Sequence, residues 1–280
     1  RDNGNLLFYT EGIHVFNRKQ EIMPNGSGLL GDDYLIDGVH YRLGMHQGFC
    51  AVPDFTDRDR YYLFNLTHAG TNTIPARSKL YYNIVDMTLD GGYGDVYKNI
   101  PLDTFQQTMF GEAIAAIPGA NCDVWVLLYD RGILGYKAFH VSDQGINPVP
   151  VVSPSITGLS IGDMMQGRLT FSPDRKMIAM AYNYNGAIIG YPVRGCVVAK
   201  FDPATGIVSD EILVETDEGG SAAAFSPDDS KLYLSSRTPV QGRLRLWQYD
   251  LSDYNIFSIR QSKYSVDSLL GIYDDIRRRD

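Results

Sequence analysis

The chain has 280 residues, of which 44% are hydrophobic and 12% aromatic, so it can bury a sizeable core as one domain. Its 25 Lys and Arg residues against 33 Asp and Glu residues give a net charge of −8, which argues against a nucleic-acid surface because phosphate binding requires clustered cations. No segment approaches the run of about 18 apolar residues that a membrane-spanning helix requires, so no such segment is expected.

The N-terminal residues predict part of a β unit. Asn5–Thr10 and Ile13–Asn17 are typical of the second and third strands of such a unit, and no innermost strand precedes them in the sequence. We therefore expect the chain to begin inside a domain.

From residue 48 onward, one unit returns four times: a short apolar strand, a proline turn and a second strand. The turn prolines are Pro53, Pro118, Pro173 and Pro227. Two more extended segments follow in each unit; in the last unit they are Arg243–Tyr249 and Ile256–Arg260. A periodic unit of four strands is typical of a propeller blade.

The predicted fold class is therefore all-β: a β-propeller of four-stranded antiparallel blades, with about five blades visible of a ring of six to eight. Residues 1–280 are expected to form a single domain that is incomplete at both ends. The expected blades are 1–30, 46–104, 110–153, 165–216 and 219–263, with a remnant of a sixth blade at 264–280.

The sequence Ser-Pro-Asp occurs at 172–174 and again at 226–228, at equivalent places in two units. A serine close to an aspartate could indicate a nucleophile. Recurrence at equivalent positions instead favours an aspartate that caps its own turn.

The first strand of each predicted blade lines the central channel, and a polar residue enters the channel five or six positions before each turn proline. These residues are Gln47, Glu112, Arg168 and Ser221. Together they could hold a small polar or sugar ligand at the channel mouth. The alternative, which we favour, is that they hydrogen-bond water and neighbouring strand ends.

Other candidate chemistry is sparse, and no cofactor is expected. The densest set of possible metal ligands is Asp32, Asp33, Asp37, His40 and His46. Their spacing matches no zinc or calcium pattern, so a polar surface loop is the preferred interpretation. The remaining histidines each stand alone in or beside a predicted strand and are expected to be packed or exposed rather than catalytic; they are His14, His68 and His140.

Several segments resemble the WD-repeat-like propeller region of large secreted surface proteins of gliding Bacteroidetes, which commonly precedes a type IX secretion or gliding-motility-associated C-terminal domain. The segments that carry the resemblance are 4–18 with 22–26, 82–96, 123–126 with 139–141, and 201–209. The likeness extends in register over roughly residues 4 to 260, and its motifs are fold motifs. It implies a location outside the cell or on the outer-membrane surface.

Two classes of function follow. The preferred one is a non-enzymatic interaction or presentation module of a secreted or cell-surface protein, with a role in type IX secretion, gliding or adhesion. Its expected partner is a protein or glycan at the cell surface, or a component of the secretion machinery. The alternative is a propeller enzyme, a glycan hydrolase or lyase, with its site at the channel mouth.

Overall fold

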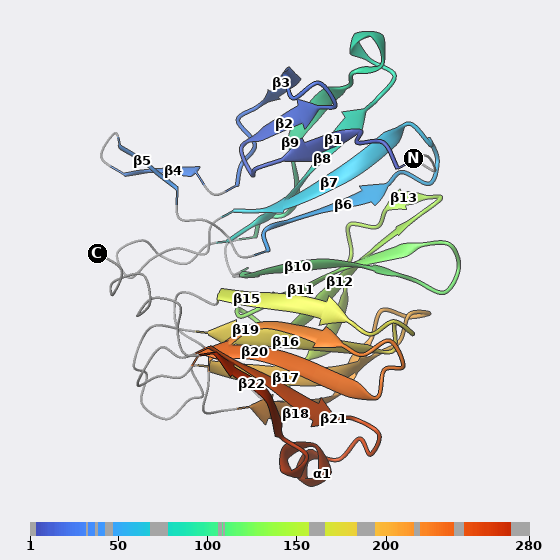
Figure 1. Ribbon diagram of the computed structural model, residues 1–280. Coiled ribbons are helices and arrows are strands. Elements are labelled where there is room, and N and C mark those ends of the chain that lie inside the picture. The colour runs from blue at the N-terminus through green and yellow to red at the C-terminus, as the bar shows by residue number, and fades with distance from the viewer. Residues whose placement is uncertain are drawn as a thin grey trace, which may run out of the picture.

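The computed structural model describes residues 4–31, 33–36, 39–42, 47–67, 78–105, 108, 110–156, 166–183, 194–215, 219–237 and 244–269. These residues form five antiparallel sheets in chain order and a separate hairpin (Figure 1). Within the described ranges, no helix has the length and apolar character that crossing a membrane requires.

Each sheet is a meander whose strands mostly follow one another in sequence. Sheet 1 contains β1 (Phe8–Thr10), β2 (His14–Asn17) and β3 (Ile22–Ser27). Sheet 2 contains β6 (Phe49–Pro53), β7 (Arg60–Leu66), β8 (Leu80–Asp86) and β9 (Asp95–Asp103), with a 3₁₀ turn, η1 (Asp90–Gly92), between the last two. Sheet 3 contains β10 (Phe110–Pro118), β11 (Val124–Asp130), β12 (Gly135–Ser142), β13 (Gly145–Ile146) and β14 (Val151–Pro154). In sheet 3 both β13 and β14 pair with β12.

The last two sheets each have four strands. Sheet 4 contains β15 (Gln166–Phe171), β16 (Met177–Asn183), β17 (Arg194–Phe201) and β18 (Val208–Glu215). Sheet 5 contains β19 (Gly219–Phe225), β20 (Lys231–Arg237), β21 (Leu244–Asp250) and β22 (Tyr264–Leu269). Repeated four-stranded meanders confirm the predicted all-β propeller architecture, whereas the number of blades in a complete ring stays a prediction.

Four apolar cores hold the sheets together, one between each successive pair. Strand β11 shows how one strand serves two cores, because side chains alternate between the faces of a strand. Val126 and Leu128 face sheet 2, while Leu127 and Tyr129 face sheet 4. All four side chains are fully buried. Both faces of an inner sheet are therefore covered, which explains strands with long apolar runs.

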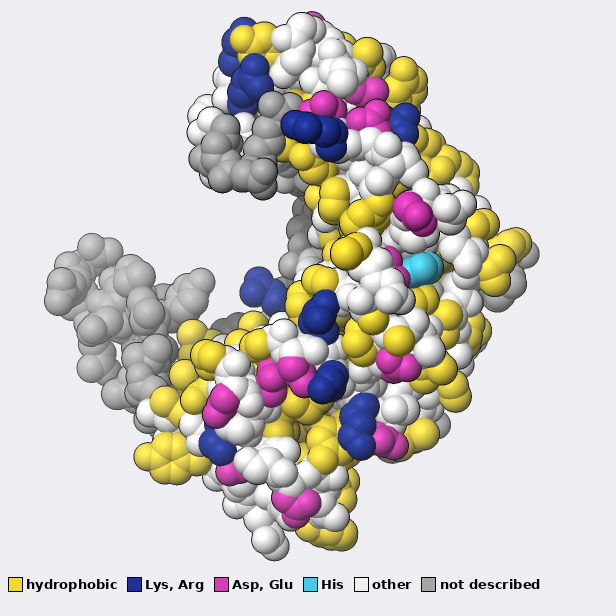
Figure 2. Space-filling view, turned by 90° about the vertical axis from the view of Figure 1, so that its right-hand side faces the viewer, with side chains coloured by type: hydrophobic (Ala, Val, Ile, Leu, Met, Phe, Trp, Pro, Cys, Tyr) yellow, Lys and Arg dark blue, Asp and Glu magenta, His cyan; other side chains and the backbone are white. Residues whose placement is uncertain are grey.

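The stacked sheets form an arc around a hollow (Figure 2). The first strands of sheets 2 to 5 (β6, β10, β15 and β19) lie side by side in that order. We call the edge that carries the four proline turns the proline edge; it is on the right in Figure 1 and faces the viewer in Figure 2. The opposite edge, where these four strands begin, is the mouth edge.

The Ser-Pro-Asp turns are structural. Ser172 Oγ donates to Asp174 Oδ1 (2.7 Å) and accepts from the N–H of Met177 (2.9 Å). Ser226 makes the same pair of bonds with Asp228 and Lys231. Asp174 also accepts from the N–H of Lys176 (2.9 Å) and Asp228 from the N–H of Ser230 (3.2 Å), so the prediction that the aspartate caps its own turn is confirmed at both sites.

Three sequence expectations are corrected. Ile256–Arg260 was expected to be a strand but lies in helix α1 (Ile256–Gln261), because the Asn255 side chain accepts from the N–H groups of Phe257 and Ser258 and caps the helix. The fourth strand of sheet 5 is β22, so residues 264–269 complete the fifth blade rather than begin a sixth. The expected surface loop at 32–46 contains a hairpin of β4 (Asp33–Ile36) and β5 (Val39–Arg42).

Replacing Ser172 with Ala should lower the free energy of unfolding by about 1 to 3 kcal/mol, because the N–H of Met177 loses its acceptor and the Asp174 carboxylate loses a donor. Urea denaturation followed by tryptophan fluorescence measures this. Ser209→Ala, at an exposed position of β18, is the matched control and should leave the midpoint unchanged. Equal midpoints for both variants would contradict the capping role.

Candidate functional site

The mouth edge brings together strand ends that carry the four predicted channel residues. Gln47 lies two residues before β6, Glu112 lies in β10, Arg168 in β15 and Ser221 in β19. Arg168 and Ser221 are exposed, whereas Glu112 is only 3% exposed. Counting back from the turn prolines therefore found residues at one edge of the fold, but their surroundings differ.

Gln47 connects three sheets. Its N–H donates to the carbonyl of Glu112 (3.2 Å), and its carbonyl accepts from the N–H of Ile114 (3.1 Å), which makes a parallel bridge at the edge of β10. Its side-chain Nε2 donates to the carbonyl of Leu169 (3.1 Å), and its Oε1 accepts from the N–H of the same residue (2.8 Å). The carboxamide thus pairs with the edge of β15 as a strand backbone would. For Gln47, this is the hydrogen bonding to a neighbouring strand that the favoured interpretation expected.

Glu112 occupies an irregular part of β10. Phe110 pairs with Asp130 and Ile114 pairs with Leu128, so three residues of β10 lie opposite the single residue Tyr129 of β11. Bulges of this kind redirect side chains and are common beside functional sites. The bridge to Gln47 holds the backbone on both sides of Ala113, the residue that follows Glu112, and Glu112 itself is buried in the innermost strand.

A cation with two carboxylates lies between sheets 2 and 3 at the same edge. Lys137 Nζ lies 2.6 Å from Asp103 Oδ2 and 2.8 Å from Asp130 Oδ2. The two carboxylates are almost fully buried. Burial alone would lower the pKa of Lys137, but the hydrogen bonds to Asp103 and Asp130 raise it overall, so the ammonium stays charged. We give the name mouth cluster to these three residues together with Glu112, which the register places on β10, the strand paired with that of Asp130.

The mouth cluster was missed by sequence reasoning, apart from Glu112. Asp103 ends β9, Asp130 ends β11 and Lys137 follows the start of β12, and nothing in their local spacing suggests a shared site. The sequence feature that points to this cluster is a charged residue at the end of a buried strand, because strands that end at the same edge bring such residues together.

The predicted metal ligands are not brought together among the described residues. Asp32, Asp37 and His46 lie outside the described residues, and for Asp33 and His40 the structure places only the backbone, in β4 and β5. Among the described residues, no group of three or more His, Cys, Asp or Glu side chains could hold a metal ion.

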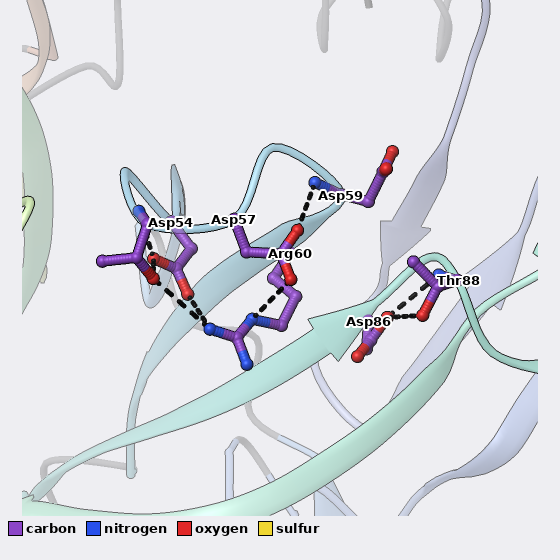
Figure 3. A network of polar contacts seen from close by, with 7 residues as sticks. Asp54, Asp57, Asp59, Arg60, Asp86 and Thr88 are labelled. Atoms are coloured by element: carbon purple, nitrogen blue, oxygen red, sulfur yellow. Dashed lines mark hydrogen bonds and ion pairs between the residues drawn. The ribbon is translucent and has the colours of Figure 1, made fainter.

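A second carboxylate cluster lies at the proline edge of sheet 2, in the turn that joins β6 to β7 (Figure 3). Asp54 accepts from the N–H and hydroxyl of Thr56 (2.8 and 2.6 Å) and from Arg60 (2.9 Å). Burial would raise the pKa of Asp54, but the bonds from Thr56 and the charge of Arg60 lower it overall. A carboxylate held ionised by its own turn is poorly suited to donate a proton, so we assign this cluster to the fold.

The sequence suggested that His140 stands alone, but in the structure its side chain has partners. Its Nε2 lies 2.7 Å from Asp123 Oδ2, and its ring stacks on Trp125 with centroids 4.4 Å apart. Trp125 Nε1 in turn donates to the carbonyl of Pro203 in sheet 4 (3.0 Å). This set joins sheets 3 and 4 at the proline edge and contributes no group to the mouth cluster.

No family model matches the sequence, and no curated protein matches it. Among solved structures, the chain is similar to a periplasmic gluconolactonase of Pseudomonas aeruginosa, with 10% identity over 94% of this chain and 66% of that chain and a TM-score of 0.47. It is similar to a putative 6-phosphogluconolactonase of Bacteroides fragilis, with 12% identity over 95% of this chain and 81% of that chain and a TM-score of 0.39. A GH74 enzyme of Niastella koreensis matches at 14% identity over 89% of this chain and 37% of that chain, with a TM-score of 0.39.

These matches correct the preferred function. The sequence favoured a non-enzymatic interaction or presentation module, whereas the matched proteins are named as lactonases and a GH74 enzyme. We therefore withdraw the prediction that the protein is not an enzyme. At such low identity no residue role is transferred from them. The resemblance to secreted surface proteins of gliding Bacteroidetes stays a prediction, because none of these three structures is named as one.

Replacing Gln47 with Leu should lower the free energy of unfolding by about 1 to 3 kcal/mol, because both backbone groups of Leu169 lose their partner. Urea denaturation measures the change. Gln144→Leu is the matched control, because Gln144 is exposed and its side chain bonds only to the neighbouring Asp143. A Gln47→Leu midpoint equal to that of the control would show that the bridge contributes nothing.

Proposed function

We propose that the protein is an enzyme that hydrolyses a glycan at the mouth edge, with Glu112 as its proton-transferring group. The observation that carries this proposal is the position of Glu112: a glutamate that is 3% exposed, in a bulge of the innermost strand, at the edge where the first strands of successive sheets begin. Glycoside hydrolysis depends on such a carboxyl group to move a proton at the scissile bond.

The neighbouring charged groups support this assignment of roles. Asp103 and Asp130 are held by Lys137, and Asp130 also accepts from the N–H of Gly132 (2.8 Å). These contacts fix the two aspartates as a charged frame beside the bulge. The proton transfer is assigned to Glu112 because of its burial and its place in the bulge, and Asp130, which lies on the paired strand β11, is the nearest carboxylate along the register to assist it.

The reaction conserves atoms with water as the second reactant. Glu112 gives its proton to the leaving glycosidic oxygen as the carbon–oxygen bond breaks, and the oxygen of a water molecule takes its place on the sugar carbon. One proton of that water stays on the new hydroxyl group, and a carboxylate accepts the other. Arg168 is exposed at the start of the adjacent sheet and is available to contact hydroxyl groups of the substrate.

The location expected from the resemblance, outside the cell or on the outer-membrane surface, is compatible with a glycan substrate. Glycans are abundant at cell surfaces. That location stays a prediction, as do the partners expected for it.

Replacing Glu112 with Gln should reduce kcat by about 100-fold or more, because a carboxamide cannot transfer the proton. The assay is release of reducing sugar from a panel of neutral polysaccharides and of aryl glycosides. The exposed Glu21→Gln variant is the control and should keep full activity. A product that carries a new carbon–carbon double bond would instead identify a lyase. Full activity of Glu112→Gln, or no cleavage by the wild-type protein, would contradict the proposal.

A further inference from the structure

We propose that Phe105 is an aromatic platform on which a ring of a neutral glycan chain stacks, beside the mouth cluster. This inference rests on the proposed function and names its class of substrate. The Phe105 side chain is 67% exposed, although phenylalanine is among the residues most often buried. It belongs to the connection that leads from β9 in sheet 2 to β10 in sheet 3.

The backbone that presents Phe105 is fixed by polar contacts. Lys79 Nζ donates to the carbonyl of Phe105 and to the carbonyl of Thr108 (3.0 Å). The N–H of Thr108 donates to the carbonyl of Phe105 (3.1 Å), and its hydroxyl donates to Asp103 (2.8 Å). The backbone at Phe105 itself is therefore held by hydrogen bonds to its carbonyl, which lowers the entropy that binding must overcome.

The same contacts connect Phe105 to the mouth cluster. Asp103 lies two residues before Phe105 and pairs with Lys137, whose Nζ lies 5.4 Å from the centre of the Phe110 ring. Glu112 follows Phe110 by two residues. One connection thus carries the exposed aromatic ring at its start and leads directly into the strand that holds the buried carboxyl group.

The chemistry of this part of the edge fits a sugar. A pyranose ring has one apolar face of C–H groups and a rim of hydroxyls, so it suits an exposed aromatic ring next to charged and polar side chains. A polyanionic glycan is disfavoured, because the chain carries a net charge of −8 and the mouth cluster holds three carboxylates against one ammonium. The substrate class is therefore a neutral oligosaccharide or polysaccharide.

The experiment measures binding and turnover separately. The probes are the tetrasaccharides of β-1,4-glucose, β-1,3-glucose and β-1,4-xylose, and their dissociation constants are measured by calorimetry in the inactive Glu112→Gln background. Adding Phe105→Ala should raise Kd about 5- to 10-fold for the tetrasaccharide that binds. Phe105→Trp should restore the affinity. Phe257→Ala is the matched control, because Phe257 is 74% exposed and lies on α1, the helix that connects β21 to β22 of sheet 5.

The outcomes separate this inference from the proposed function. Unchanged affinity in Phe105→Ala, equal weakening by Phe257→Ala, or no binding of any of the three tetrasaccharides would overturn the platform. Binding that depends on Phe105, together with no cleavage by the wild-type protein, would support the platform and overturn the hydrolase. In the wild-type background, Phe105→Ala should raise KM for the tetrasaccharide, whereas Phe257→Ala should leave KM and kcat unchanged.

Discussion

The structure depends on the burial of two apolar faces by each inner sheet. Hydrophobic stabilisation is roughly proportional to the apolar area removed from water, at about 25 cal/mol per Å². Residues such as Phe64, Phe139 and Tyr182 are completely buried between neighbouring sheets, which requires sheets to stand on both sides. Because each sheet twists, stacking them face to face produces an arc rather than a flat pile. The arc, seen from the proline edge in Figure 2, in turn brings the first strands together, and their starts form the mouth edge on the opposite side.

Hydrogen bonds between neighbouring sheets set how the sheets are aligned within this stack. Glu211 of sheet 4 accepts from Tyr136 of sheet 3 (2.6 Å), and Glu215, at the end of the same strand, accepts from Tyr249 of sheet 5 (2.7 Å). Between sheets 1 and 2, Asn99 Nδ2 donates to the carbonyl of Gly28 (2.9 Å). Buried polar groups are tolerated when they are bonded, and directional bonds fix a position that apolar contact leaves free. Gln47 also aligns neighbouring sheets at the mouth edge, because it donates to the carbonyl of Glu112 in sheet 3 and to the carbonyl of Leu169 in sheet 4.

The fold could be predicted from the sequence because its signals are local and repeated. Short apolar segments and a proline turn in every unit predicted the strands, and the recurrence of Ser-Pro-Asp predicted the turn capping. The sequence predicted a strand where helix α1 lies because Ile256, Phe257 and Ile259 favour a strand, whereas the capping by Asn255 is a feature of the folded chain. The site was only partly predictable. Glu112 was found by its place in the repeat, but Asp103, Asp130 and Lys137 meet through strand register, which no local pattern of this sequence reveals.

The central claim is that chemistry takes place at the mouth edge rather than at the proline edge. A crystal structure of the Glu112→Gln variant with a bound neutral tetrasaccharide tests it most directly. The account predicts a glycosidic oxygen within hydrogen-bond distance of the side chain at position 112, with one sugar ring over Phe105. A tetrasaccharide bound at the proline edge, for example against the Asp54 and Arg60 turn of Figure 3, would contradict it.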